Sequence, residues 1–165
     1  MLLGRALEIL EEAFRRIKVG MTEKDIAEVV HSIFEKKPDY FKEIGVIKEE
    51  YSWEEENCPI VLVGENLTSG GHSMPSNLVL EKGNTVYFDF GVKLTFDNGI
   101  VASSDIQRTG YTLRDGETVA PEEIQKPFDV LIEAVNLGIK EVMPGVEGYK
   151  IDEAVRRTYT KIQLS

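Results

Sequence analysis

The chain has 165 residues, of which 42% are hydrophobic and 29% are charged, which is typical of one globular domain with a buried core. No apolar run approaches the roughly 20 residues that a membrane-spanning helix needs. The net charge of −10 argues against binding to nucleic acid or anionic membranes, because both require clustered lysine and arginine. We therefore expect a single domain over residues 1–165 with no nucleic-acid partner and no membrane partner.

The N-terminus and the one cysteine indicate a cytoplasmic protein. The first residues become charged at Arg5, too early for the apolar stretch of a secretory signal. Cys58 is the only cysteine, so it cannot form an internal disulfide, and this fits a reducing compartment. Cys58 precedes an apolar run, so we interpret it as a small buried hydrophobe in preference to a nucleophile.

Two helices are predicted at the start of the chain. The spacing of apolar residues indicates a helix over residues 3–17. Thr22 and Asp25 have the spacing of a capping box, which predicts a second helix from there to about Lys37, stopped by Pro38. His31 lies inside this helix, where a lone histidine is more often a surface or core residue than a ligand.

Residues 39–57 are charged and aperiodic, and we expect a surface excursion whose Trp53 could dock a partner. The next segments alternate between apolar strands and turns rich in glycine. The predicted elements are a strand at 59–63, a loop at 64–75 that contains His72, a turn at 82–84, a strand at 85–91, a hairpin turn at 97–99 and a returning strand at 100–111. Two amphipathic helices are expected to follow, at 121–142 and 148–162.

Asp89 stands in the middle of a predicted strand, where aspartate is uncommon because its carboxylate must be paired, solvated or metal-bound. One interpretation is that Asp89 simply faces water, as polar residues do on a one-faced antiparallel sheet. The other is that it belongs to a metal site with Asp105 on the returning strand. Asp97 is a rival acid, but its Asn-Gly context favours turn chemistry.

The length of the hairpin loop decides whether Asp89 and Asp105 share a face of the sheet. A two-residue loop places Asp105 opposite Val92, whose side chain points away from Asp89. A three-residue loop places Asp105 opposite Gly91, on the face of Asp89 and diagonal to it, so the two carboxylates can converge. Two carboxylates converge without repulsion only around a cation or a proton. We predict the three-residue loop or a bulge that restores the same parity.

These residues, in their order, resemble the "pita-bread" metallopeptidases, the superfamily of methionine aminopeptidases and Xaa-Pro peptidases. The resemblance is carried by His72, by Asp89-Phe90-Gly91 and by Ser104-Asp105-Ile106-Gln107-Arg108-Thr109. Two flanking segments add to it, Val19-Gly20-Met21-Thr22-Glu23 and Met143-Pro144-Gly145-Val146. These segments are more similar to those of the Xaa-Pro dipeptidases and aminopeptidases than to those of methionine aminopeptidase. The implied fold class is α+β, half of a pita-bread fold, with helices packed on one face of an antiparallel sheet.

The resemblance implies a metal-dependent peptidase that cleaves a short peptide near its N-terminus, at an Xaa-Pro bond. Asp89 and Asp105 match two ligands of a centre with two divalent ions, commonly manganese, cobalt or zinc, and His72 matches the histidine that assists catalysis. The family places a further histidine and two glutamates after the helix at 148–162, where this chain has none. The spacing of the two aspartates is also longer than in the family, and Gln107 stands where the family has threonine.

Two functional hypotheses therefore remain. The chain is either the N-terminal half of an Xaa-Pro dipeptidase-like catalytic domain, inactive by itself, or a non-catalytic binding module on the same fold. Half of a pita-bread fold exposes a sheet edge and an apolar face. We therefore also predict a homodimer in which a second copy covers that surface.

Overall fold

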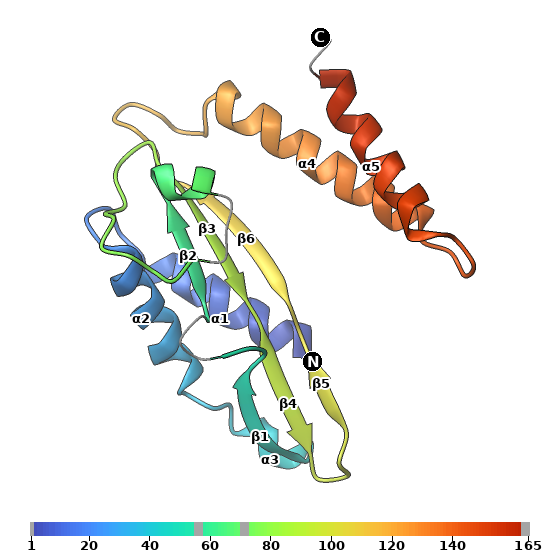
Figure 1. Ribbon diagram of the computed structural model, residues 1–165. Helices are drawn as coiled ribbons and strands as arrows, with labels where there is room; N and C mark the ends of the chain where they lie inside the picture. The colour runs from blue at the N-terminus through green and yellow to red at the C-terminus, as the bar shows by residue number, and fades with distance from the viewer. Residues whose placement is uncertain (1, 55–57, 70–72, 163–165) are drawn as a thin grey trace. The chain divides into compact units, whose positions relative to one another are not determined.

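The computed structural model describes residues 2–54, 58–69 and 73–162 (Figure 1). The chain divides into two compact units, one up to Gly116 and one from Glu117 onward. Each unit is described here by itself, and the prediction of one domain over residues 1–165 stays a prediction.

Both helices predicted at the start of the chain are present. Helix α1 spans Leu2–Arg16, and α2 spans Glu23–Phe34 behind the predicted capping box, in which the Asp25 amide donates to Thr22 and the Thr22 amide donates to Asp25. Helix α2 ends three residues before the predicted Lys37. The carbonyls of Phe34 and Lys36 accept hydrogen bonds from the Arg5 guanidinium. These carbonyls therefore have partners without a further turn of helix.

The predicted surface excursion at residues 39–57 is wrong in its described part. This segment forms the short helix α3, Tyr40–Glu43, and strand β1, Val46–Tyr51, which pairs with strand β4, Val92–Phe96. The sequence pattern did not predict this strand, because one of its inward residues is charged. Glu49 is buried and pairs with Arg5 at 2.9 Å.

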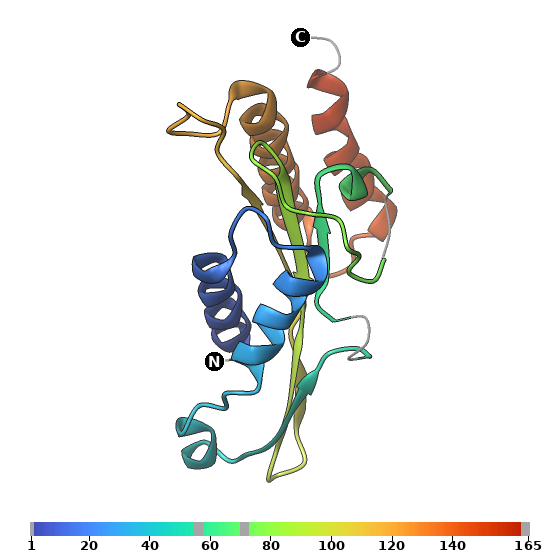
Figure 2. The same cartoon turned by 90° about the vertical axis from the view of Figure 1, so that its left-hand side faces the viewer.

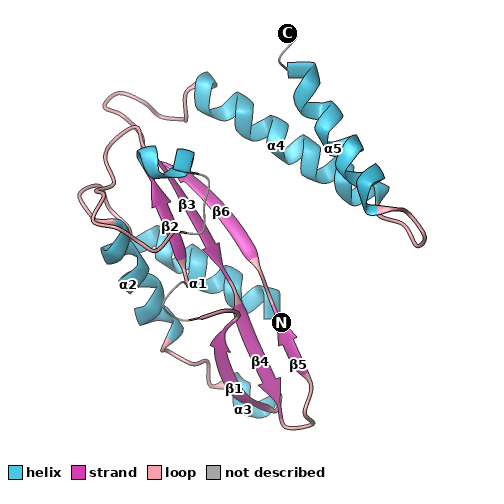
Figure 3. Ribbon diagram, in the orientation of Figure 1, coloured by secondary structure: helices cyan, strands magenta, loops and turns pink. Residues whose placement is uncertain are grey.

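The remaining strands are antiparallel and extend one long hairpin (Figure 3). One sheet has the order β1-β4-β5 and the other β2-β3-β6. Strands β3 and β4 are separated only by Gly91, so the hairpin runs through both sheets. The bounds are Ile60–Val63 for β2, Thr85–Phe90 for β3, Val101–Ser103 for β5 and Ile106–Tyr111 for β6, with a 3-10 helix, Gly64–Ser69, after β2.

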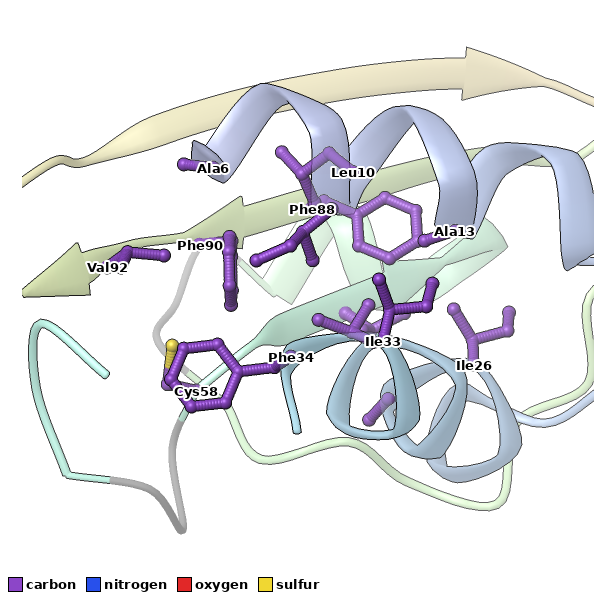
Figure 4. Close-up of a cluster of buried hydrophobic side chains, with 14 of the residues drawn as sticks. Ala6, Leu10, Ala13, Ile26, Ile33, Phe34, Cys58, Phe88, Phe90 and Val92 are labelled. Carbon is purple, nitrogen blue, oxygen red and sulfur yellow. The ribbon is translucent and has the colours of Figure 1, made fainter. Parts of the chain in front are cut away.

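Helices α1 and α2 cover one face of the strands, as Figure 2 shows. The predicted alternation of β3 is confirmed, since Val86, Phe88 and Phe90 point into the core and are at most 1% exposed. They pack against Leu10 and other apolar residues of the two helices (Figure 4). The fold class is therefore α+β with helices on one face, and the polar side chains of β3 lie on the other face.

The second unit is a pair of packed helices, α4 over Glu122–Glu141 and α5 over Gly148–Ile162. They approach closely at Gly138, where a Cβ atom would lie 2.9 Å from Val155. Pro127 lies inside α4, in its second turn, where it removes one backbone hydrogen bond of the helix. No helix in the described part of the chain has the length and apolar character needed to cross a membrane.

Candidate metal centre

The hairpin turn has the predicted three-residue loop. The Phe96 amide donates to the Ile100 carbonyl at 2.9 Å, and the Gly99 amide donates back to the Phe96 carbonyl at 3.0 Å. Gly99 has a φ of +83°, the left-handed conformation that closes such loops. The resulting register pairs Lys93 with Ser103 and Asp89 with Gln107. The same parity holds through both sheets.

The returning strand is interrupted where it crosses Gly91, a difference from the continuous strand predicted over residues 100–111. Ser104 spans the interruption: its amide donates to the Val92 carbonyl at 2.8 Å, and its hydroxyl accepts from the Val92 amide at 3.0 Å. The chains approach so closely that a Cβ atom on Gly91 would lie 2.4 Å from the Ser104 carbonyl oxygen. Glycine is therefore required at position 91, and Asp105 follows directly in the gap between β5 and β6.

Asp89 and Asp105 share one face of the hairpin, which confirms the parity prediction. The side-chain amide nitrogen of Gln107 donates to Asp89 Oδ1 at 2.9 Å and to Asp105 Oδ1 at 2.8 Å. Asp89 is buried at 8% exposure, whereas Asp105 and Gln107 are exposed. One amide thus joins the two carboxylates from residues that are far apart in sequence.

The negative charge of Asp89 and Asp105 contributes to the raised pKa values of two neighbouring side chains, Tyr87 and Cys58. Burial raises the pKa of Tyr87, and the carboxylates of Asp89 and Asp105 raise it further, with a hydrogen bond to Asp89 contributing. Burial also raises the pKa of Cys58 to about 12; a backbone hydrogen bond at Gly91 partly offsets this shift, and the same two carboxylates reinforce it. The Cys58 thiol is buried and protonated near neutral pH, so its interpretation as a buried hydrophobe is confirmed.

The donor set fits only part of a metal centre. Carboxylate oxygens suit hard divalent ions, and two of them converge here. Within the ranges that the structure describes, however, no three side chains of histidine, cysteine, aspartate or glutamate gather closely enough to hold an ion. His72 lies outside the described residues. The two aspartates alone therefore do not complete a dinuclear centre, and we derive no catalytic step through a metal from them.

Two other candidate residues, Asp97 and His31, make contacts elsewhere in the fold. Asp97 lies in the hairpin turn, where its amide donates to the Gly45 carbonyl at 2.8 Å. His31 Nδ1 forms a hydrogen bond with the Tyr51 hydroxyl on β1. The His31 contact agrees with a non-ligand role, and the position of Asp97 in the three-residue loop agrees with turn chemistry.

Glu23 is a structural residue that sequence reasoning missed. Its side chain is fully buried and accepts from the Val63 amide, the Ser76 amide and the Asn66 side-chain amide at 2.8–3.0 Å. These partners lie on both sides of the segment that contains His72, so Glu23 fixes both ends of that segment to α2. An acid in the first turn of a helix is ordinary, because the helix dipole favours it there, and this hid its role.

The chain resembles known proteins over nearly its whole length. The model of metallopeptidase family M24 matches residues 3–164. Solved structures with a similar fold include an X-Pro aminopeptidase from Thermotoga maritima MSB8 (24% identity, TM-score 0.67) and a prolidase from Pyrococcus furiosus (20% identity, TM-score 0.68). A methionine aminopeptidase from Rickettsia prowazekii has 19% identity and a TM-score of 0.61. No curated protein matches the sequence.

The chain spans less than half the length of the first two of these structures. The match to the aminopeptidase includes 97% of this chain but only 40% of the aminopeptidase chain. The match to the prolidase includes 98% of this chain and 42% of the prolidase chain. For the methionine aminopeptidase the two values are 95% and 56%. The resemblance to part of a pita-bread fold is thereby confirmed.

Proposed function

Because this chain belongs to metallopeptidase family M24, we propose that it supplies the first part of the metal centre of a metal-dependent peptidase. In this proposal Asp89 and Asp105 are metal ligands, and His72 assists catalysis. The substrate is a short peptide cleaved near its N-terminus, at an Xaa-Pro bond. The named activities of the similar structures support the substrate class, and the fold likeness supports the architecture.

The observation that carries the proposal is the convergence of two aspartates on one face. Asp89 and Asp105 lie on different strands, and only the odd loop parity brings them together. Both have an oxygen within 2.9 Å of the same nitrogen, and this shared partner supports a common role for the two carboxylates. Converging carboxylates in a hairpin carry a cost from charge repulsion, which a function that uses them would explain.

A divalent ion, with manganese, cobalt and zinc as the candidates, would supply the chemistry when bound. It would polarise the scissile carbonyl and lower the pKa of the attacking water. This chain's own contribution is to hold the two carboxylates by the hairpin and to fix the ends of the His72 segment through Glu23. We propose that the 165-residue chain by itself is inactive, because two carboxylates cannot preorganise two ions.

Metal analysis together with an Xaa-Pro dipeptide hydrolysis assay tests this proposal. We expect the purified chain to carry less than one equivalent of metal and to show no hydrolysis with added manganese or cobalt. Two bound ions with turnover would show that the chain is complete as an enzyme, against the proposal. The control is the Asp89→Asn variant, which must remove any hydrolysis that comes from this site.

One observation favours a second candidate, a non-catalytic binding module of the same fold. The Gln107 amide donates a hydrogen bond to each carboxylate, so a neutral side chain already pairs with both acids. Metal binding that depends on Asp89 and Asp105 would favour the peptidase, whereas its absence would favour the module. The cytoplasmic location and the homodimer stay predictions.

A further inference from the structure

The carboxylate pair on β3 and β6 is held together by a neutral donor. Gln107 lies directly opposite Asp89 in the ladder, and Asp105 precedes it by two residues, so all three side chains project from one face. A side-chain amide has two N–H groups, and these serve the two carboxylates, at 2.9 Å to Asp89 and 2.8 Å to Asp105. Hydrogen bonds to ionised acceptors are among the stronger ones in proteins.

The Gln107 hydrogen bonds use one oxygen of each carboxylate, the same atoms that a bridging ion would ligate. A divalent ion that ligates the same two oxygens would lie at roughly 2.0–2.6 Å from each of them. The Gln107 nitrogen lies less than 3 Å from both, so an ion that ligates these two oxygens competes with the amide for them. An ion that approaches the two oxygens from the side of the amide displaces the Gln107 side chain.

We propose that Gln107 is a metal-gating residue, a latch that competes with a divalent cation for Asp89 and Asp105 and so weakens their affinity for it. This inference rests on the proposed function, because it takes the two aspartates as the metal ligands. Gln107 is exposed, so its side chain has solvent to turn into. The apparent affinity for metal is the intrinsic affinity multiplied by the fraction of molecules in which the latch is open.

Binding of Mn²⁺, measured by the loss of the free-ion signal in electron paramagnetic resonance, tests the latch. We expect Gln107→Ala to bind Mn²⁺ about tenfold more tightly than the wild type, because the competing donor is gone. Gln107→Glu should bind about a hundredfold more tightly, because it replaces the donor with a third carboxylate. The matched control is Gln125→Ala, since Gln125 donates to Asp129 in the same way on α4, far from these strands in sequence. The control should leave Mn²⁺ affinity unchanged.

A thermal melt separates gating from a structural role. In EDTA, Gln107→Ala should melt about 2–4 °C below the wild type, because the carboxylates then repel each other. Excess Mn²⁺ should restore the melting temperature of this variant and raise that of Gln107→Glu further, and Gln125→Ala should show no metal dependence.

The outcomes distinguish the latch from the proposed function. Equal Mn²⁺ affinity in the wild type and in both Gln107 variants would overturn the latch and leave the aspartates as ligands. Weaker binding by Gln107→Ala would overturn it as well, because the amide would then support the ion. No Mn²⁺ binding by any variant, including Gln107→Glu, would overturn both the latch and the metal role of Asp89 and Asp105.

Discussion

Replacing Glu23 by alanine is expected to lower the free energy of unfolding by about 4 kcal/mol. The side chain is fully buried and accepts from two backbone amides, those of Val63 and Ser76, and from the side chain of Asn66. Alanine leaves these donors without an acceptor in the interior, at about 1–3 kcal/mol for each one that stays unsatisfied. Urea unfolding followed by circular dichroism measures the loss.

The matched control for Glu23 is Glu28→Ala, which removes the same charge from an exposed position of the same helix. It should change stability by no more than about 0.5 kcal/mol. Glu23→Gln should fall between the two, because it keeps one acceptor oxygen but turns a donor toward the other amides. Native-state hydrogen exchange should show faster exchange at Val63 and Ser76 in Glu23→Ala. A Glu23→Ala variant as stable as the control would contradict the anchoring role of this carboxylate.

Replacing Arg5 by methionine is expected to cost about 3–5 kcal/mol, because it leaves Glu49 as an uncompensated buried charge. Arg5 Nε donates to Glu49 Oε1 at 2.9 Å, and its Nη2 donates to the carbonyls of Phe34 and Lys36. The guanidinium thus joins α1, the end of α2 and β1. Denaturant unfolding of the Arg5→Met variant measures the cost.

A double-mutant cycle supplies the control for Arg5. The variant that carries both Arg5→Met and Glu49→Met removes the two charges together and replaces them with apolar chains of similar length. It should be more stable than the sum of the single changes implies, by about 2 kcal/mol or more, because no buried charge is then left alone. Additive costs of the two single changes would show that the pair does not act as a unit.

The hairpin could be predicted from sequence because it follows from local chemistry. Asn98-Gly99 marks the turn, and only one loop parity allows the carboxylates of Asp89 and Asp105 to meet. The predicted register is confirmed from Thr85 to Tyr111. The break at Gly91 was not predicted, because it depends on a close approach to Ser104 that no local pattern shows.

The features that sequence reasoning missed are buried charges. Glu49 disguised β1 as a charged surface segment, and Glu23 looked like an ordinary acid at a helix start. Each is buried because a partner distant in sequence satisfies it, Arg5 in one case and Val63 with Ser76 in the other. Hydrophobic periodicity assumes that charge means exposure, and it fails wherever tertiary pairing reverses that assumption.

The role of Gln107 was beyond prediction for a related reason. Gln107 replaces the threonine that the resemblance leads us to expect at this position. Only the register shows that position 107 stands opposite Asp89 and two residues from Asp105. The consequence of the change comes from where the amide nitrogen lies, between the two carboxylates.

Mn²⁺ affinity measured in parallel for the wild type, Asp89→Asn and Asp105→Asn tests most directly whether this face is a metal site. Asparagine keeps the size of the side chain and removes the charged oxygen donor. We expect weak binding by the wild type and an affinity at least about tenfold lower in each variant, because each loses one of two carboxylate ligands. Equal Mn²⁺ affinity in all three proteins would contradict the assignment of Asp89 and Asp105 as metal ligands.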